Sequence, residues 1–450
     1  MDLEQDRMQR ASLTEMDSAC SWADFYSFSI KPSSQLSTSM SAGPAGGERP
    51  PSPSTRQEAK RSMLIKREIE ALETELVDLR RDLHRHPELG FQEVRTSGIV
   101  ADYLKACGLE VRTGVARTGV VGLLRGNHAG RTVLLRADMD ALPVQEQNEV
   151  PYRSVHDGKM HACGHDGHTA MLLVAAKILA RHKDSLRGNI KFVFQPNEED
   201  AGARQMVDEG VLEDPHVDAA LGLHLWSQLE TGRLGIAPGP IMASSDYFKL
   251  TVTGQGGHGG APHTSVDPVI CAAAIIQSVQ SIQTREIDAL KPTVITFCKV
   301  NCGTSPIIVP DRIVLEGSIR CLYDGAEDVK ERFRRMVESM CSVYRTTYEL
   351  KINCGNILLS NDPDMTDFIS KVAGKVVGPD HIETNIRMMV GEDFAEFNKD
   401  IPGAFYFVGT GNKGKGTCYP HHHPRFNMDE DSLPIGVEMH ATAALEFLQD

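Results

Sequence analysis

The chain has 450 residues, 41% of them hydrophobic, which is enough for two or three domains with a buried core. Its formal net charge of −14 argues against nucleic acid as a partner, because phosphate binding requires a basic face. It contains no run of about 18 apolar residues, so we expect no membrane-spanning segment and no membrane partner.

The first 62 residues differ in composition from the rest of the chain. They are rich in Ser, Pro and Gly, and PAGGERPPSPS stands at 44–54. Such a composition buries too little apolar surface to offset its ordering entropy, so 1–62 is predicted to be a disordered tail. The acidic start (Asp2, Glu4, Asp6) does not resemble a secretory signal, and the ten cysteines have no regular spacing. Together these features predict a cytoplasmic protein with free thiols.

From residue 64 the hydrophobic periodicity predicts alternating helices and strands. Helices are expected within 64–89, at 93–107, at 168–181 and at 201–210. Strands are expected at 132–138, 189–196 and 217–226. This alternation is typical of an α/β fold with a mostly parallel sheet.

The pattern changes between 245 and 357. Strands at 247–254, 293–300, 312–322 and 347–355 and helices at 266–284 and 325–345 follow the order β-α-β-β-α-β of a ferredoxin-like domain. After this segment the α/β pattern returns, with a helix expected at 363–377, a strand at 404–409 and a helix at 433–448. We therefore predict one catalytic α/β domain, 63–244 and 358–450, interrupted by an inserted α+β domain at 245–357.

The densest cluster of chemically active side chains is HACGHDGH at 161–168. Cys163 and His165 are suitable ligands for first-row divalent cations, and Gly164 between them allows a tight backbone. A histidine-rich loop without a role and a nucleophilic Cys163 are the alternatives.

Three further features have ordinary explanations when each is taken alone. Glu198 and Glu199 could form a solvated turn, His224 could be a structural histidine, and the run of histidines at 421–423 could lie on the surface. However, the acidic pair, His224 and the segment 136–140 all fall at predicted carboxyl ends of strands, where open α/β sheets form their sites. Their convergence with HACGHDGH indicates a binuclear metal site and metal-dependent hydrolysis.

The ordered set of motifs resembles the aminoacylase/carboxypeptidase family of metal-dependent hydrolases. Within it, the chain is similar to hippurate hydrolases, N-acyl-amino-acid amidohydrolases and plant auxin-conjugate hydrolases. The resemblance covers about 75–450 and rests on DLRRDLHRHPELGFQE (78–93), RADMDALPVQE (136–146), MHACGHDGHTAML (160–172), FQPNEED (194–200), LGLHLW (221–226), GGHGGAPHTSVDPV (256–269), VPDRIVLEGSIR (309–320), GEDFAEF (391–397) and HHHPRFN (421–427).

The resemblance implies a role for individual residues. Glu198 would be the general base. His422 would be a ligand if HHP (422–424) is the family's His-x-Pro, although His421 and His423 leave that register open by one position. The implied metal ligands are Cys163, His165, Glu199, His224 and His422.

The resemblance also implies a zinc-peptidase-like catalytic domain with a ferredoxin-like lid and dimerisation domain, so a homodimer is compatible with it. The implied cofactor is a pair of divalent cations, with zinc, manganese, cobalt and nickel all suited to the donors. The implied reaction is hydrolysis of the amide bond of an N-acyl amino acid. A carboxypeptidase or dipeptidase on the same scaffold and a non-catalytic metal-binding relative are the alternatives.

His258 stands among four glycines in GGHGG (256–260), which predicts a loop that holds an imidazole out as a hydrogen-bond donor. A flexible turn is the alternative. The resemblance favours a catalytic His258 that contacts the substrate and stabilises the oxyanion. Whether it serves its own subunit or a neighbouring one is not readable from the sequence.

Overall fold

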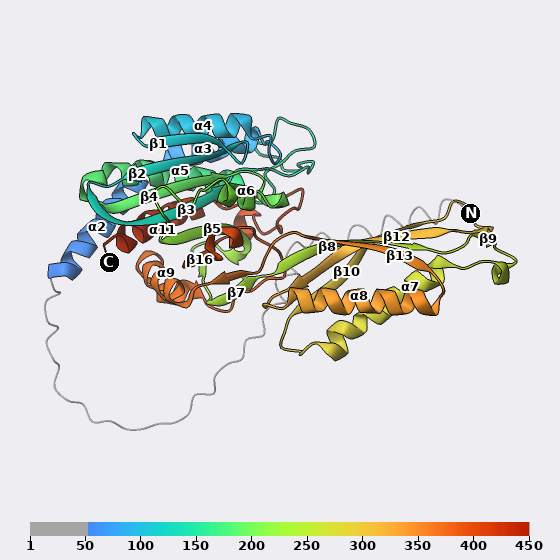
Figure 1. Cartoon of the computed structure of the whole chain (residues 1–450). Coiled ribbons are helices and arrows are strands. Elements are labelled where there is room, and N and C mark those ends of the chain that lie inside the picture. The colour runs from blue at the N-terminus through green and yellow to red at the C-terminus, as the bar shows by residue number, and fades with distance from the viewer. Residues whose placement is uncertain (1–52, 450) are drawn as a thin grey trace, which may run out of the picture.

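The computed structural model describes residues 53–449, which form two lobes built on separate sheets (Figure 1). Most of the predicted disordered tail, 1–52, lies outside the described residues. Its last ten residues, 53–62, instead belong to helix α2 (Pro53–Glu70). The reason is a change in composition after residue 55 to Gln, Glu, Ala, Lys and Arg, which favour helix. Ile65 and Ile69 then anchor the helix, because both are buried in the core.

The larger lobe is built on a sheet of eight strands in the order β1-β2-β4-β3-β5-β16-β6-β15. Its four central strands, β4, β3, β5 and β16, are parallel. β1 and β2 pair antiparallel with their neighbours, whereas β6 is antiparallel to β16 and parallel to β15. The predicted parallel sheet is therefore present at the centre, and the β1–β2 hairpin at its edge was not predicted. The strands are Glu110–Val115 (β1), Gly119–Arg125 (β2), His128–Asp138 (β3), Arg187–Gln195 (β4), Ala219–Glu230 (β5), Leu234–Gly235 (β6), Ile382–Glu383 (β15) and Gly403–Gly411 (β16).

Helices cover both faces of this sheet, because successive side chains of a buried strand point to opposite sides. On β3, Val133 and Leu135 belong to the core beneath α5 and α11, whereas Leu134 belongs to a second core with Met206 and Phe397 on the other face. α5 packs against α11 and α3. The helices of this lobe besides α2 are Glu73–Arg85 (α3), Val94–Ala106 (α4), His165–Arg181 (α5), Ala203–Asp208 (α6), Pro363–Val376 (α9), Ala395–Asn398 (α10) and Leu433–Phe447 (α11).

The smaller lobe is an antiparallel sheet in the order β10-β12-β8-β13. Its two helices share a core with the sheet that includes Phe248, Leu250 and Phe333. This is the ferredoxin-like arrangement that the sequence predicts. Its elements are Ser244–Thr253 (β8), Pro268–Ser281 (α7), Thr293–Cys302 (β10), Arg312–Cys321 (β12), Ala326–Val343 (α8) and Thr347–Cys354 (β13).

Two short strand pairs lie at opposite ends of the smaller lobe. β7 (Gly239–Met242) pairs with β14 (Leu359–Asn361) where the chain passes between the lobes. β9 (Gly257–His258) pairs with β11 (Ile308–Val309), and β9 lies at the end farthest from the large sheet (Figure 1). Among residues 53–449, no helix combines the length and the apolar character needed to cross a membrane.

Candidate metal centre

The candidate ligands come from four places in the larger lobe. His165 is the first residue of α5, and Cys163 lies two residues earlier, before the N-cap residue Gly164. Glu199 follows the end of β4, His224 lies on β5, and His422 lies in the loop between β16 and α11. β3, β4 and β5 are parallel neighbours, so their carboxyl ends meet at one edge of the sheet, as expected for an open α/β fold.

The structure brings these five side chains together in two groups that share one residue. The donor atoms of Cys163, His165 and His224 lie within 4.8 Å of one another, and so do those of Cys163, Glu199 and His422. Sγ of Cys163 is 3.5 Å from Nε2 of His224, and Nε2 of His422 is 3.4 Å from Oε1 of Glu199. Donors that bind one cation at about 2.0–2.3 Å must themselves lie a few ångström apart, so each group is compact enough to hold an ion.

Hydrogen bonds to the backbone and to carboxylates orient two of the histidines. Nδ1 of His165 donates to the carbonyl oxygen of Asp140 at 2.9 Å and lies 3.1 Å from its carboxylate. Nδ1 of His224 donates to the carbonyl oxygen of Leu225 at 2.7 Å. With Nδ1 protonated, the lone pair of each ring is on Nε2, which is the nitrogen that faces the cluster. Such outer contacts are how proteins set the tautomer of metal-binding histidines.

The other two histidines of HACGHDGH have different surroundings. Nδ1 of His168 donates to Asp138 at 2.6 Å, and its Nε2 accepts the backbone N–H of Leu225 at 2.9 Å, so neither nitrogen is left for a cation. His161 is buried, belongs to neither donor group, and neither ring nitrogen has a hydrogen-bond partner among the described residues. Burial lowers the pKa of His161 to about 4, so its ring is neutral.

The structure distinguishes the three consecutive histidines at 421–423. Nε2 of His421 donates to the carbonyl oxygen of Leu225 at 2.9 Å, which directs this ring into the protein. Nδ1 of His423 accepts a backbone N–H within its own loop at 3.0 Å. His422 adopts a left-handed backbone with φ of 66° and places Nε2 beside Glu199. His422 is thus the member of the run that reaches the donor cluster.

Glu198 is buried next to His165 and Glu199 of the cluster. Its carboxylate is 3.9 Å from Nε2 of His165 and close to the carboxylates of Glu392 and Asp393. Burial first, and then the negative charges of Glu392, Glu199 and Asp393, raise the pKa of Glu198 well above its usual range. A carboxylate whose pKa is raised is a stronger base than an ordinary carboxylate, as the role of general base requires.

Two residues of this centre, Arg136 and Asp140, received no individual role from the sequence, which indicated only the segment 136–140 that contains them. Asp140 joins the two donor groups, since it accepts the Nδ1–H of His165 and, at 3.1 Å, the backbone N–H of Glu199. Arg136 is fully buried and donates to the carboxylates of Asp138, Glu392 and Asp393. The available signal was the charged pattern of RADMD at the end of an otherwise apolar strand, because buried charges require partners.

His258 lies apart from the cluster. It is exposed on β9, and its Nδ1 accepts the backbone N–H of Gly260 at 2.9 Å. Figure 1 places β9 at the end of the smaller lobe that is most distant from the large sheet. Within this chain, the arrangement shown does not bring His258 to the five candidate ligands.

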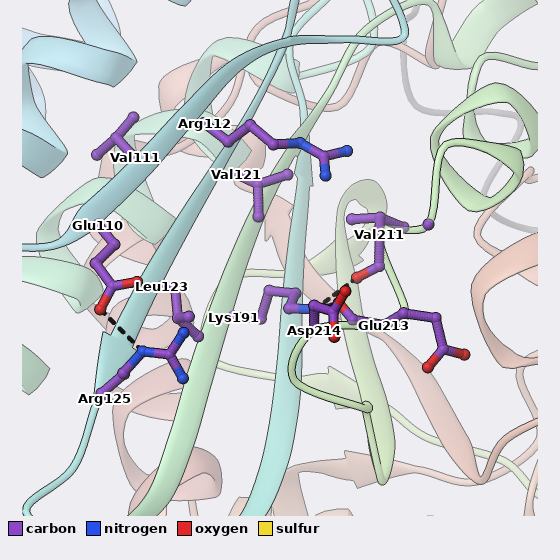
Figure 2. Close-up of a pocket in the computed structure, with 11 residues that line it drawn as sticks. Glu110, Val111, Arg112, Val121, Leu123, Arg125, Lys191, Val211, Glu213 and Asp214 are labelled. Carbon is purple, nitrogen blue, oxygen red and sulfur yellow. Dashed lines mark hydrogen bonds and ion pairs between the residues drawn. The ribbon is translucent and has the colours of Figure 1, made fainter.

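A cavity of about 280 Å³ lies elsewhere on the larger lobe (Figure 2). None of the candidate site residues lines it. Nζ of Lys191 donates there to the carbonyl oxygens of Val211, Glu213 and Pro215 at 2.7–3.0 Å, so all three of its N–H groups are used within the protein. This cavity therefore adds no residue to the candidate site.

An α/β sheet with thiol, imidazole and carboxylate donors at its carboxyl edge and a ferredoxin-like insertion defines a metal-dependent hydrolase. Peptidase family M20/M25/M40 matches residues 134–446, and this chain belongs to that family. The predicted family, fold class and type of enzyme are thereby confirmed.

Individual relatives span almost the whole folded part of the chain. It is 40% identical to thermostable carboxypeptidase 2 of Saccharolobus solfataricus, over 85% of this chain and 98% of the relative. It is 37% identical to an N-acetylcysteine deacetylase of Bacillus subtilis, over 84% of this chain and 98% of that relative. Among solved structures, the Bacillus subtilis YXEP protein, described as a dinuclear metal-binding peptidase of the M20 family, superposes with a TM-score of 0.74 at 34% identity, over 84% of this chain and 99% of that one.

Proposed function

We propose that this protein hydrolyses the amide bond of N-acyl amino acids, releasing a carboxylic acid and a free amino acid. The observation that carries the proposal is the pair of donor groups that share Cys163, with the carboxylate of Glu198 beside them. The relatives that are named as deacetylases of acetylated cysteine support the same type of bond and substrate.

The residues present fit a pair of divalent cations. Nε2 of His165 and Oε1 of Glu199 are buried and have no hydrogen-bond partner among the described residues. Unpaired buried polar atoms are costly, and a cation would satisfy both. Burial, and then the charges of Glu199 and Glu198, raise the pKa of the Cys163 thiol well above its usual range, so ligation must displace its proton. Cys163, His165 and His224 would hold one cation, and Cys163, Glu199 and His422 the other.

The side chains then define the proton transfers. Bound cations would supply an activated water and a polarised amide carbonyl. Glu198 would accept the proton of the attacking water on a carboxylate oxygen and deliver it to the departing amide nitrogen. Its place beside both donor groups, at 3.9 Å from His165, suits this transfer.

We further propose that His258 donates a hydrogen bond to the developing oxyanion and does so from a second copy of the chain. The first argument is that β9, which carries His258, lies at the end of the smaller lobe farthest from the large sheet (Figure 1). The second is that Ile307 and Ile308, on and next to the strand paired with His258, are 65% and 53% exposed. Large apolar side chains that are exposed to solvent next to a polar side chain are typical of a protein–protein interface. Eight cysteines of the described residues are free thiols, which supports a cytoplasmic location: Cys107, Cys163, Cys271, Cys298, Cys302, Cys321, Cys341 and Cys354.

A carboxypeptidase is the second candidate, because the thermostable carboxypeptidases of Saccharolobus solfataricus are 39–40% identical to this chain. The test is a panel of N-acetyl, N-benzoyl and indole-acetyl amino acids beside dipeptides and N-blocked dipeptides, each assayed with zinc, manganese, cobalt or nickel added to metal-free protein. The proposal expects a higher kcat/KM for simple N-acyl amino acids. Preference for blocked dipeptides would establish the carboxypeptidase, and no turnover of any substrate would indicate a non-catalytic relative.

A further inference from the structure

The segment DLRRDLHRHPELGFQE, residues 78–93, supplies none of the candidate ligands. It runs from α3 through a turn to the start of α4. Nevertheless, it contacts three separate stretches of the chain that carry or orient those ligands: the turn at 197–201, the start of α5, and the residues that follow β3.

The first contact is made by Glu93, whose side chain is completely buried. Its Oε1 accepts the backbone N–H of Asn197 at 2.9 Å, and its Oε2 accepts the hydroxyl of Thr118 at 2.6 Å. Asn197 directly precedes Glu198, so this hydrogen bond holds the backbone from which the acidic pair projects.

The backbone at this turn is strained, which explains why it needs support. Asn197 and Ala201 have φ values of 54° and 59°, on either side of a single 3-10 turn, Glu198–Asp200. Residues other than glycine rarely adopt this left-handed conformation and keep it only where their surroundings impose it. Holding the turn in this shape determines where Glu198 and Glu199 point.

Gly90 packs closely against the same turn. A Cβ atom on Gly90 would lie only 1.9 Å from Oδ1 of Asn197. No larger residue permits that approach, so the glycine allows the segment to pack directly on the Asn197 side chain.

The second contact fixes the start of α5. Nε of Arg80 and Nδ1 of His84 both form hydrogen bonds to Oδ2 of Asp166, at 2.9 and 2.8 Å. All three side chains are buried. Asp166 is the neighbour of His165 in the first turn of α5. A buried ion pair that loses one member is strongly destabilised, so this contact resists movement of the helix end.

The third contact reaches Asp140. The backbone N–H of Ala141 donates to the carbonyl oxygen of Glu88 at 2.8 Å. Asp140, one residue earlier, is the residue that accepts hydrogen bonds from both His165 and Glu199. The segment is thus hydrogen-bonded next to each donor group and next to the residue that joins them.

We propose that residues 78–93 hold the two donor groups in the geometry that binds cations, with Glu93 as the positioning residue for the group that contains Glu199. This inference rests on the proposed function, because it concerns the same metal centre. Outer contacts of this kind typically change metal affinity by about 10–100-fold when they are removed.

Glu93→Ala, Glu93→Gln and Glu88→Ala form a matched set of variants. Alanine removes both acceptors of Glu93, whereas glutamine can still accept from Asn197 and can donate to the Thr118 hydroxyl. Glu88 is the control, because it is a carboxylate of the same segment whose oxygens accept backbone N–H groups, at 3.0 and 2.8 Å, from Arg95 and Thr96 in the first turn of α4. Its side chain supports a helix end, and among the described residues its hydrogen bonds go to α4 rather than to the turn at 197–201.

The experiment is calorimetric titration of the metal-free full chain with Mn²⁺ or Co²⁺, alongside a thermal melt of each variant. We expect wild type to bind two equivalents, Glu93→Ala to weaken one of them by about tenfold or more, and Glu93→Gln to restore most of that affinity. Glu88→Ala should keep wild-type affinity for both equivalents even if its Tm falls. Should Glu93→Ala not fold, Gly90→Ala takes its place and is expected to weaken the same equivalent.

Wild-type affinity for both cations in Glu93→Ala or in its substitute would overturn this inference but not the proposed function. So would an equal loss of affinity in Glu88→Ala, since the loss would then follow stability. Failure of glutamine to restore affinity would also contradict it. A wild-type chain that binds no cation would instead refute the proposed metal centre, and this inference with it.

Discussion

Sγ of Cys163 lies 3.5 Å from Nε2 of His224, although the two residues are 61 positions apart in the chain. The same sulfur belongs with Glu199 and His422 to the second donor group, so it stands between the two candidate cation sites. This position makes Cys163 the side chain whose loss should affect both sites at once.

Cys163→Ser is therefore expected to lower the content of both cations, with activity returning only in part at high metal concentration. A thiolate is a far better ligand for these cations than a hydroxyl group. Metal analysis after dialysis and activity against added metal would check this. In addition, a thiol-alkylating reagent should inactivate metal-free wild type faster than the loaded form; equal rates would count against ligation by Cys163.

Glu198→Gln should reduce kcat by at least about a hundredfold while both cations remain bound, because the amide preserves the shape but cannot accept a proton. The measurement is kcat on an N-acyl amino acid together with metal content. Retention of more than about a tenth of the wild-type rate would show that another group serves as the base.

His422→Ala and His423→Ala test the register of the histidine run. Nε2 of His422 is 3.4 Å from Glu199, whereas His423 bonds within its own loop. We expect His422→Ala to lose one equivalent of cation and most activity, and His423→Ala to resemble wild type in both. Metal titration of the two variants distinguishes them, and the reverse pattern would shift the ligand by one position.

His258→Ala should lower kcat by about a hundredfold or more with metal content unchanged, since it removes a donor to the oxyanion. To find which subunit His258 serves, inactive Glu198→Gln and His258→Ala chains are mixed under conditions of proven subunit exchange. If His258 acts across a two-fold dimer, an equal mixture should regain about a quarter of wild-type activity, because half of the dimers then carry one complete site. No recovery would mean that His258 acts within its own chain.

Local pattern was sufficient for much of the fold and for the identity of the candidate donors. Apolar periodicity located the central strands β3, β4 and β5 and the ferredoxin-like lobe. This is possible because the burial of a helix or strand produces a regular pattern of apolar residues along the sequence. The rule that sites form at the carboxyl ends of parallel strands then placed Glu199 and His224 beside the HACGHDGH segment. The structure brings these donors together as expected, and their roles stay predictions.

Which histidines are left free to bind a cation was decided only by tertiary structure. The Leu225 peptide donates its N–H to Nε2 of His168, and its carbonyl oxygen accepts Nε2–H of His421 and Nδ1–H of His224, which leaves Nε2 of His224 open. No local pattern reports such bonds between distant residues. The same reason applies to the support of Asn197 by Glu93, 104 positions away, and to the separation of His258 from the donor cluster. The sequence thus determined which side chains are candidate metal ligands. Long-range packing determined which atoms of these side chains face the candidate cation sites.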